Sequence, residues 1–293
     1  MAIVLPTRAP AFTDEDGILC GDISASGTTS NFLRLRKFLV NAGFDVLLAA
    51  QDPAAWRGTA SVVGTKEIAW SEIDCGIVHP WEWVPRRESL PDEALPKTAL
   101  WLQNLISLGA ALDFFRAGGW RLVTPTSTAA NTYRAIPAWR RRVTVVPNWY
   151  DDEIFIPSSP GGTGATSPVF LYVGAVGPAK GFVELMEIWR DVAGDQPAAR
   201  LHIAGTGALH SGGRLGSMGL AEERFERDFI APWLRSFPAE AGPVFLGAMP
   251  ARALRAEIVA ATAVIVNPSR APSETFCVAA VEALFADTPL GMR

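Results

Sequence analysis

The second half of the chain alternates short apolar runs with longer segments of helical periodicity, and this alternation restricts the possible folds more than any other feature. The apolar runs are residues 169–173, 201–204, 244–246 and 263–266. Helices are expected at residues 182–189, 251–260 and 274–285. Strands that are each followed by a helix form βαβ units, in which helices cover both faces of a parallel sheet. The pattern therefore predicts an α/β domain.

The first half shows the same alternation less regularly. Strands are expected at residues 3–5, 46–48, 76–78, 100–102, 122–123 and 143–146. Residues 31–41 have the pattern of an amphipathic helix with Leu33, Phe38 and Leu39 on its apolar side, and Gly43 follows as a stop signal. We therefore expect a second α/β domain, so that the chain consists of two Rossmann-like domains.

A segment rich in proline, glycine and serine separates the two halves. Residues 157–168 read PSSPGGTGATSP, a composition that buries little apolar surface and is typical of a linker. The expected organisation is an N-terminal domain over residues 1–156, a linker over 157–168 and a C-terminal domain over 169–293. A chain of 293 residues is long enough for two such domains without a disulfide or metal to stabilise them.

Composition and charge argue against several classes of protein. Hydrophobic residues make up 49 % of the chain and charged residues 19 %, which is typical of a globular protein. The net charge of −4 argues against a nucleic-acid partner. Three cysteines without a CxxC pair suit a reducing compartment, and the first ten residues lack the pattern of a signal peptide. We expect a cytoplasmic protein, with peripheral contact to the inner face of a membrane left open.

The generic nucleotide and metal motifs are incomplete. Gly205-Thr-Gly207 follows an expected strand, but His210 stands where a dinucleotide-binding fingerprint has its third glycine. The run from Gly174 to Lys180 lacks the Ser or Thr that follows the lysine of a P-loop. Three histidines without an HExxH or CxxC motif give no metal-ligand set. We therefore expect neither a cofactor nor a metal.

The most informative segment is residues 267–284, with the sequence NPSRAPSETFCVAAVEAL. Ser273 can cap a helix that begins near Glu274, and the first turn of such a helix offers N–H groups to an anion. Glu274 and Glu282 would then lie about 12 Å apart along the helix axis. This separation is too long for the carboxylate pair of a glycosidase. We therefore expect the two residues to hold different parts of one long ligand, such as a nucleotide sugar.

Four segments resemble, in order, the group 1 glycosyltransferases, a family with the GT-B fold and retaining chemistry. They are Asn148-Trp-Tyr-Asp151-Asp-Glu-Ile-Phe155, Tyr172-Val-Gly174 with Lys180-Gly181, residues 201–207, and Pro268-Ser with Glu274, Phe276 and Glu282-Ala283. The resemblance implies two Rossmann-like domains that face each other across a cleft. Trp149 and Ala175 depart from the family pattern, which usually has glycine and arginine there, and Arg270 is a candidate to replace the lost cation.

The resemblance also implies roles for residues of the C-terminal domain. Lys180 would neutralise the donor diphosphate, Glu274 would bind the donor sugar, and Glu282 would accept hydrogen bonds from the ribose hydroxyls. The backbone at three further positions would approach the sugar and phosphate, namely Phe276, Cys277 and Val278. Four glycines would let the backbone approach the donor closely. They are Gly174, Gly181, Gly205 and Gly207.

In the N-terminal domain the candidates are fewer. Gly27 would face the donor phosphate, and His79 would contact the sugar or the acceptor. Trp81 and Trp83 are candidates for an acceptor platform, with packing in the core as the alternative. Residues 140–142 are three arginines that could meet an anionic lipid or a phosphate-bearing acceptor, with a solvated basic turn as the alternative.

The expected function is retaining transfer of a sugar from a nucleotide sugar to a hydroxyl of a glycan, glycolipid or small molecule, in polysaccharide or glycolipid synthesis. Two alternatives remain open: a non-catalytic relative that binds a nucleotide sugar or glycan, and a phosphorylase or epimerase of the same fold. The chain ends at Arg293, where the family continues with a further strand and helices. We therefore expect a truncated C-terminal domain with exposed apolar surface near the edge of its sheet.

Overall fold

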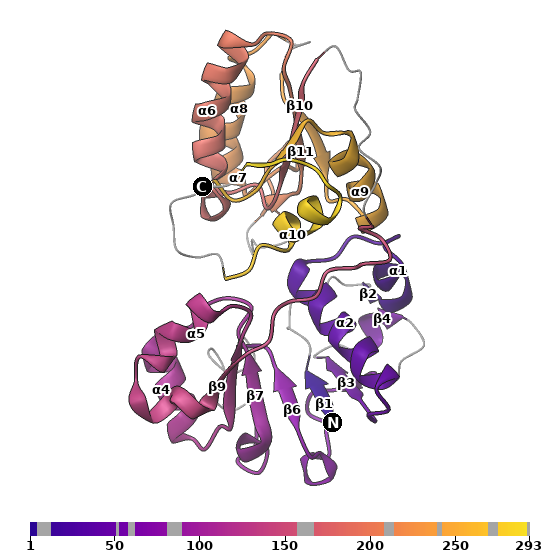
Figure 1. Ribbon diagram of the computed structural model, residues 1–293, viewed down its shortest axis with the longest axis vertical. Coiled ribbons are helices and arrows are strands. Elements are labelled where there is room, and N and C mark those ends of the chain that lie inside the picture. Colours follow the sequence, from indigo (N-terminus) through magenta and orange to yellow (C-terminus); the bar gives the residue numbers. More distant parts are fainter. Residues whose placement is uncertain are drawn as a thin grey trace. The chain divides into compact units, whose positions relative to one another are not determined.

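The structure is a computed structural model that describes residues 1–4, 13–50, 53–57, 62–80, 90–156, 167–207, 214–238, 242–268 and 275–291. The chain divides into two units of α/β structure (Figure 1). Unit 1 comprises Met1–Cys20 and Ala25–Trp149, and unit 2 comprises Gly21–Ser24 and Tyr150–Arg293. Unit 2 thus begins before the expected linker, of which residues 157–166 lie outside the described residues.

Unit 1 is built on a seven-stranded parallel sheet with the strand order β5-β3-β1-β6-β7-β8-β9. The strands are β1 (Ala2–Val4), β3 (Leu47–Ala50), β5 (Val62–Gly64), β6 (Gly76–Val78), β7 (Thr98–Trp101), β8 (Arg121–Thr124) and β9 (Val143–Val145). β2 (Thr13–Asp14) and β4 (Trp56–Arg57) pair with each other separately. Ile3 of β1 lies opposite Leu48 on one side and Ile77 on the other, so the strand order reverses between β1 and β6. Ligands of open α/β sheets bind at such a reversal.

The helices of unit 1 begin where a polar side chain can cap them. They are α1 (Glu15–Leu19), α2 (Gly27–Asn41), α4 (Leu108–Arg116) and α5 (Ser127–Arg134), with 3-10 turns η1 (Pro53–Ala55), η2 (Trp70–Glu72), η3 (Leu95–Lys97) and η4 (Pro137–Arg142). The Ser26 hydroxyl accepts a hydrogen bond of 3.1 Å from the N–H of Thr29. This cap explains why α2 begins at Gly27, four residues before the helix expected from its apolar pattern.

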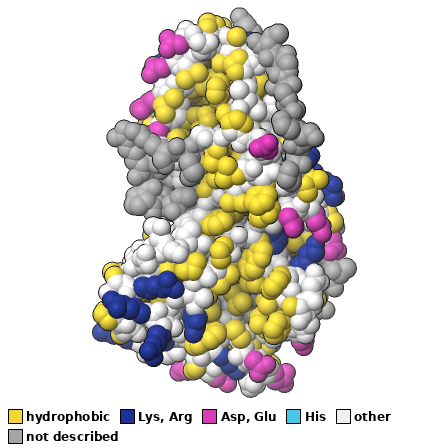
Figure 2. All heavy atoms as spheres, in the orientation of Figure 1, with side chains coloured by type: hydrophobic (Ala, Val, Ile, Leu, Met, Phe, Trp, Pro, Cys, Tyr) yellow, Lys and Arg dark blue, Asp and Glu magenta, His cyan; other side chains and the backbone are white. Residues whose placement is uncertain are grey.

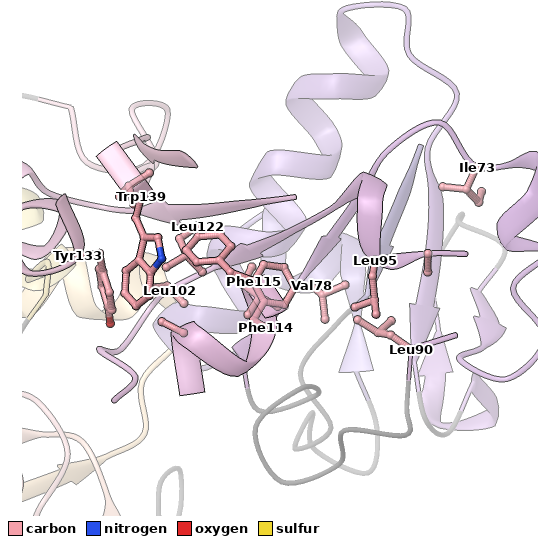
Figure 3. Close-up of a cluster of buried hydrophobic side chains, with 14 of the residues drawn as sticks. Ile73, Val78, Leu90, Leu95, Leu102, Phe114, Phe115, Leu122, Tyr133 and Trp139 are labelled. Carbon is pink, nitrogen blue, oxygen red and sulfur yellow. The ribbon is translucent and has the colours of Figure 1, made fainter. Parts of the chain in front are cut away.

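Two hydrophobic clusters lie on the two faces of this sheet. Figure 3 shows part of the larger one, in which Phe114 and Phe115 of α4 and Tyr133 of α5 pack with Val78 and Leu122 of the sheet. The smaller cluster joins α2 to the other face and includes Phe32, Leu33, Leu48 and Trp101. Helices thus cover both faces, as expected for βαβ units.

Unit 2 has a five-stranded parallel sheet with the order β12-β11-β10-β13-β14. The strands are β10 (Val169–Val173), β11 (Arg200–Ala204), β12 (Val244–Gly247), β13 (Ala263–Ile265) and β14 (Leu290–Gly291). The order reverses between β10 and β13, where Leu171 lies opposite His202 on one side and Val264 on the other. The expected α/β class with parallel sheets is therefore confirmed in both units.

The helices of unit 2 lie on both sides of its sheet, with α6 and α8 on one side and α9 on the other (Figure 1). They are α6 (Phe182–Asp195), α7 (Glu223–Phe225), α8 (Ala231–Leu234), α9 (Ala251–Ala260) and α10 (Val278–Phe285), with a 3-10 turn η5 (Pro178–Lys180) and a π-helical turn η7 (Glu226–Ile230) between α7 and α8. Within the described residues, no helix has both the length and the apolar character needed to cross a membrane.

Successive residues of β10 contribute to two different cores, as the alternation of side chains along a strand requires. Tyr172 is fully buried against Phe182 and Trp189 of α6. Its neighbour Leu171 is fully buried in the cluster that contains Ile258 of α9 and Ala283 of α10.

A segment from the first fifth of the chain completes α9. Pro250, the N-cap residue of this helix, provides no side-chain cap. Instead, the carbonyl oxygen of Gly21 accepts a hydrogen bond of 3.1 Å from the N–H of Arg252. The Arg252 guanidinium also lies 3.3 Å from the Asp22 carboxylate. This explains why Gly21–Ser24 belongs to unit 2 although the chain on either side belongs to unit 1.

Candidate functional site

The loops that follow β10, β11 and β12 meet through their backbones at the carboxyl edge of the sheet of unit 2. The N–H of Gly174 donates a hydrogen bond of 3.1 Å to the carbonyl of Ala204, and the N–H of Gly205 donates one of 2.7 Å to the carbonyl of Gly247. We call the loop contacts at Gly174, Gly205 and Gly247, together with Gly207, which lies against Val176 of the loop after β10, the glycine junction. It lies beside the strand-order reversal, where open α/β sheets bind ligands.

Two of the expected glycines have no room for a side chain. Gly205 has a φ of 149°, and a Cβ on it would overlap the carbonyl oxygen of Gly174. A Cβ on Gly207 would lie 2.6 Å from the Cα of Ala221 and 3.1 Å from the carbonyl oxygen of Val176. The structure therefore brings Gly174, Gly205 and Gly207 together and explains why small residues are needed there.

The loop that carries Lys180 is held by the strand before it. The Tyr172 hydroxyl lies 3.0 Å from the carbonyl oxygens of both Ala175 and Lys180, so its proton can be donated to either. Gly181 has a φ of 71° and forms the turn into α6, which glycine adopts without strain. A fully buried tyrosine thus fixes the backbone of the half-buried Lys180 next to Gly181.

The helix that carries Glu282 differs from the prediction. It begins at Val278, with Cys277 as its N-cap residue, four positions after the start expected from the sequence. Thr275, Phe276 and Cys277 are weak helix formers, and the helix begins only where Ala280 and Ala283 can pack into the core. The expected helix start near Glu274 is therefore wrong, and the spacing of Glu274 from Glu282 stays a prediction because Glu274 lies outside the described residues.

Glu282 is nevertheless buried, with 7 % of its surface exposed, in the middle of α10. Phe276, Cys277 and Val278 are half-buried just before and at the start of this helix. Four other candidates lie outside the described residues: Glu274, Arg270, Trp81 and Trp83. His210 lies outside them as well.

In unit 1 the candidates are His79 and Gly27. His79 follows β6, and Gly27 begins α2, the helix between β1 and β3 in the chain; the strand order reverses between β1 and β6. His79 is 2 % exposed and lies with its ring centroid 6.0 Å from that of Phe32 in α2.

Gly27 is the first residue of α2, and a Cβ there would meet nothing within 4 Å. A side chain at this position would therefore meet open space. The Ser26 hydroxyl takes the N–H of Thr29, so the N–H groups that suit an anion are those of Gly27 and Thr28.

Burial determines the charge of His79. Removal from water lowers the pKa of its imidazole from 6.5 to about 3, so the ring is neutral at pH 7. Its chemistry at neutral pH is therefore that of a hydrogen-bonding imidazole rather than of a cation.

We expect this buried histidine to make the stability of unit 1 depend on pH. Its pKa is lower in the folded state, so the unfolded state binds the extra proton, and stability falls as the pH drops below 6.5 toward 3. At about pH 5 the loss relative to neutral pH is about 2 kcal/mol. Urea unfolding at both pH values should show this loss reduced in His79→Gln and retained in His202→Gln. Equal losses in wild type and His79→Gln would contradict the assignment.

The segment that resembles an interdomain motif serves local structure in part. The side-chain amides of Asn148 and Gln103 exchange two hydrogen bonds of 2.8 and 2.9 Å. The Asp151 carboxylate accepts from the N–H of Ile154 at 3.1 Å and closes the turn that places Phe155 in the core. Trp149, which stands where glycine is usual, packs in unit 1 with its ring centroid 5.7 Å from that of Trp101.

One buried residue near the glycine junction is absent from the candidates that the sequence suggested. Glu226, with 2 % of its surface exposed, accepts hydrogen bonds from the N–H groups of Met218, Leu220 and Ala221 at 2.6, 2.8 and 3.3 Å. The carbonyl of Leu220 in turn accepts a hydrogen bond of 2.8 Å from the N–H of Gly207. Glu226 therefore holds the segment against which the glycine junction packs.

A sequence signal for Glu226 does exist. Ile230 and Trp233 follow it at spacings of four and seven residues, which places a carboxylate on the apolar face of a helix. A charged residue on such a face is buried only if it is paired or hydrogen-bonded.

Comparison with known proteins finds a family match for the C-terminal part of the chain. Residues 159–290 match the family described as Glycosyl transferases group 1. No curated protein matches the chain.

Three solved structures are similar to the chain over nearly its whole length. Sucrose-phosphate synthase from Thermosynechococcus elongatus has a TM-score of 0.60 at 15 % identity, covering 99 % of this chain and 80 % of that one. Anabaena HepE in complex with UDP-glucose has a TM-score of 0.62 at 14 % identity, covering 99 % and 79 %. An E. coli protein described as trehalose-6-phosphate and bound with UDP-2-fluoro glucose has a TM-score of 0.61 at 9 % identity, covering 97 % and 81 %. Residues 159–290 are therefore similar to the group 1 glycosyl transferases, and the chain has the GT-B fold of the three solved structures.

Proposed function

We propose that this chain transfers a sugar from a nucleotide-sugar donor to a hydroxyl acceptor, with retention of configuration at the sugar. The observation that carries the proposal is the glycine junction beside Lys180, at the carboxyl edge of the sheet in the part of the chain that matches the group 1 family. The glycines let the loops pack tightly enough to line the carboxyl edge of the sheet with backbone groups, and the lysine supplies positive charge for a diphosphate. HepE and the E. coli protein bind UDP-sugars, which makes a UDP-sugar the first donor to test.

The proposed roles follow the order of the elements along the donor. Lys180 neutralises the diphosphate, and Glu282 accepts hydrogen bonds from the ribose. The backbone from Phe276 to Val278 approaches the sugar and phosphate, while Glu274 binds the sugar. In unit 1, the N-terminus of α2 at Gly27 offers N–H groups to the donor phosphate.

The proposed reaction needs no nucleophile from the protein. The bond from the anomeric carbon to the diphosphate oxygen breaks, the acceptor oxygen bonds to the same face of that carbon, and its proton passes to the departing diphosphate. Lys180 stabilises the negative charge that develops on this leaving group. His79, neutral at pH 7, acts as a hydrogen-bonding group toward a sugar or acceptor hydroxyl. We further propose that transfer needs no divalent metal, which activity in the presence of EDTA would test.

A second candidate function is favoured by Ala175. The family usually has an arginine there, so this chain has one fewer cation in the loop between β10 and α6. A relative that binds a nucleotide sugar without transferring the sugar would fit this loss. Release of UDP from UDP-glucose, with or without an acceptor, would exclude this candidate.

Nucleotide binding provides the direct test. Isothermal titration with UDP, GDP and ADP should show binding of at least one of them to the wild type. Loss of one charge-assisted phosphate contact weakens binding by about 10- to 100-fold, which is the effect expected for Lys180→Ala. Lys37→Ala removes the same charge from the exposed surface of α2 and should bind as the wild type does. Absence of binding to all three nucleotides would refute the proposed function.

A further inference from the structure

Positive charge is concentrated in one stretch of unit 1 that the proposed reaction does not use. Residues 114–150 contain six arginines and neither aspartate nor glutamate, in a chain whose net charge is −4. The arginines are Arg116, Arg121, Arg134, Arg140, Arg141 and Arg142. Such separation of charge creates a local potential of opposite sign to that of the whole chain.

The fold gathers these arginines on one surface. Arg116 ends α4, Arg121 begins β8, and residues 140–142 end η4 just before β9. The guanidinium of Arg142 donates to the backbone carbonyls of Gly119 and Trp120, which ties η4 to the turn after α4. Figure 2 shows Lys and Arg side chains gathered over the part of unit 1 that Figure 1 labels α4, α5 and β9.

Carboxylates of the described residues form no ion pair with these arginines. Among the described residues, the ion pairs of arginines with carboxylates involve Arg36, Arg224, Arg227 and Arg252, and none of the six. The six instead donate to neutral groups where they have partners: Arg134 to the carbonyl of Val143, for example, and Arg121 to the Thr144 hydroxyl. The positive charges are therefore not cancelled by ion pairs within the described residues, and Arg116, Arg140 and Arg141 expose their side chains to solvent.

An exposed tryptophan lies among the arginines. Trp120 is 42 % exposed, and the Arg121 guanidinium lies 5.0 Å from the centroid of its ring. Indole rings are amphipathic and concentrate at the boundary between lipid headgroups and acyl chains, while arginine binds phosphate groups through its planar fork of N–H donors. We name the surface formed by Arg116, Trp120, Arg121, Arg140, Arg141 and Arg142 the arginine–tryptophan surface.

We propose that the arginine–tryptophan surface binds the headgroups of a bilayer that contains anionic phospholipid. The residues lie where β8 and β9 begin, whereas His79 follows the end of β6 and so lies at the opposite edge of the same sheet. Binding through this surface therefore leaves the carboxyl edge of unit 1 free. A single-stranded nucleic acid also pairs phosphate with aromatic rings, but it stacks successive bases on several such rings, and the arginine–tryptophan surface contains one, Trp120.

Co-sedimentation with vesicles tests the proposal. The wild type should bind vesicles of phosphatidylglycerol mixed with phosphatidylcholine, should not bind phosphatidylcholine alone, and should dissociate in high salt. Each basic residue near an anionic bilayer contributes about fivefold in affinity, so Arg116→Gln with Arg140→Gln and Arg141→Gln should weaken binding by about 100-fold. These three side chains are exposed, and circular dichroism should confirm that the variant folds.

The matched control removes the same charge from exposed arginines of unit 2. Arg190→Gln with Arg224→Gln and Arg235→Gln should bind anionic vesicles as the wild type does. Insertion of Trp120 predicts a blue shift of tryptophan emission on binding, which Trp120→Ala should reduce. The proposal is overturned if the wild type does not bind anionic vesicles, if both triple variants lose affinity equally, or if the wild type binds a single-stranded oligonucleotide but not vesicles.

Discussion

Gly205→Ala should abolish nucleotide binding and lower the stability of unit 2 by about 3 kcal/mol or more, because two costs combine at this position. The φ of 149° is strained for any residue with a side chain. In addition, the new Cβ would overlap the carbonyl oxygen of Gly174, which is rigid backbone. Relief of this overlap requires the loops after β10 and β11 to separate, and the glycine junction is lost.

The matched control for this variant is Gly177→Ala. Gly177 lies in the loop after β10, has an extended φ of −179°, and would place its Cβ where nothing lies within 4 Å. The Gly177→Ala variant should therefore have the melting temperature and the UDP affinity of the wild type. Calorimetry and isothermal titration measure the two effects. If Gly205→Ala retained both the melting temperature and the affinity of the wild type, the loop contacts described above would be wrong.

Glu226→Ala is expected to have the second largest effect. The variant leaves three backbone N–H groups of the Met218–Ala221 segment without their buried acceptor, at a cost of about 3 kcal/mol in the free energy of unfolding. Because Leu220 also accepts from Gly207, we expect UDP affinity to fall together with stability. The expected order of melting temperatures is wild type, then Glu226→Gln, then Glu226→Ala, since glutamine keeps one oxygen as an acceptor.

Glu223→Ala provides the comparison for this position. Glu223 lies one helical turn before Glu226 and is exposed, so its loss should change the melting temperature little. A limited-proteolysis time course would show whether the 214–222 segment becomes more susceptible in Glu226→Ala. Unchanged proteolysis together with unchanged UDP affinity would mean that this carboxylate does not hold the loop.

Elements with strong periodic patterns were predictable from the sequence. The helix at residues 251–260 and the strands at 76–78 and 169–173 have the expected bounds, because their apolar spacing coincides with the face that the core buries. The start of α10 was not predictable in this way. Ser273 is a good cap by type, but the helix starts only at Val278, where tertiary packing of Ala280 and Ala283 stabilises it.

The candidate site was predictable to the extent that it depends on backbone shape. Gly205 and Gly207 stand in a short motif after a strand, and their steric need for glycine follows from how closely the loops pack. Glu226 is indicated by its place on the apolar face of a helix, but its N–H partners belong to the preceding loop, which has no periodicity. The burial of His79 depends on contacts that no local pattern indicates. The membership of Gly21–Ser24 in unit 2 is of the same kind, since it depends on Arg252, which lies more than 200 positions away in the sequence.

That distant cap has a consequence for folding autonomy. A fragment that starts at Tyr150 would contain every strand of the unit 2 sheet, yet α9 would lose the carbonyl of Gly21 that accepts the N–H of Arg252. Ile154 and Ala251, which lie against Gly21, would be uncovered at the same time. A fragment cut at residue 150 would therefore not be a complete folding unit. During synthesis, the segment that caps α9 leaves the ribosome more than 200 residues before the helix itself.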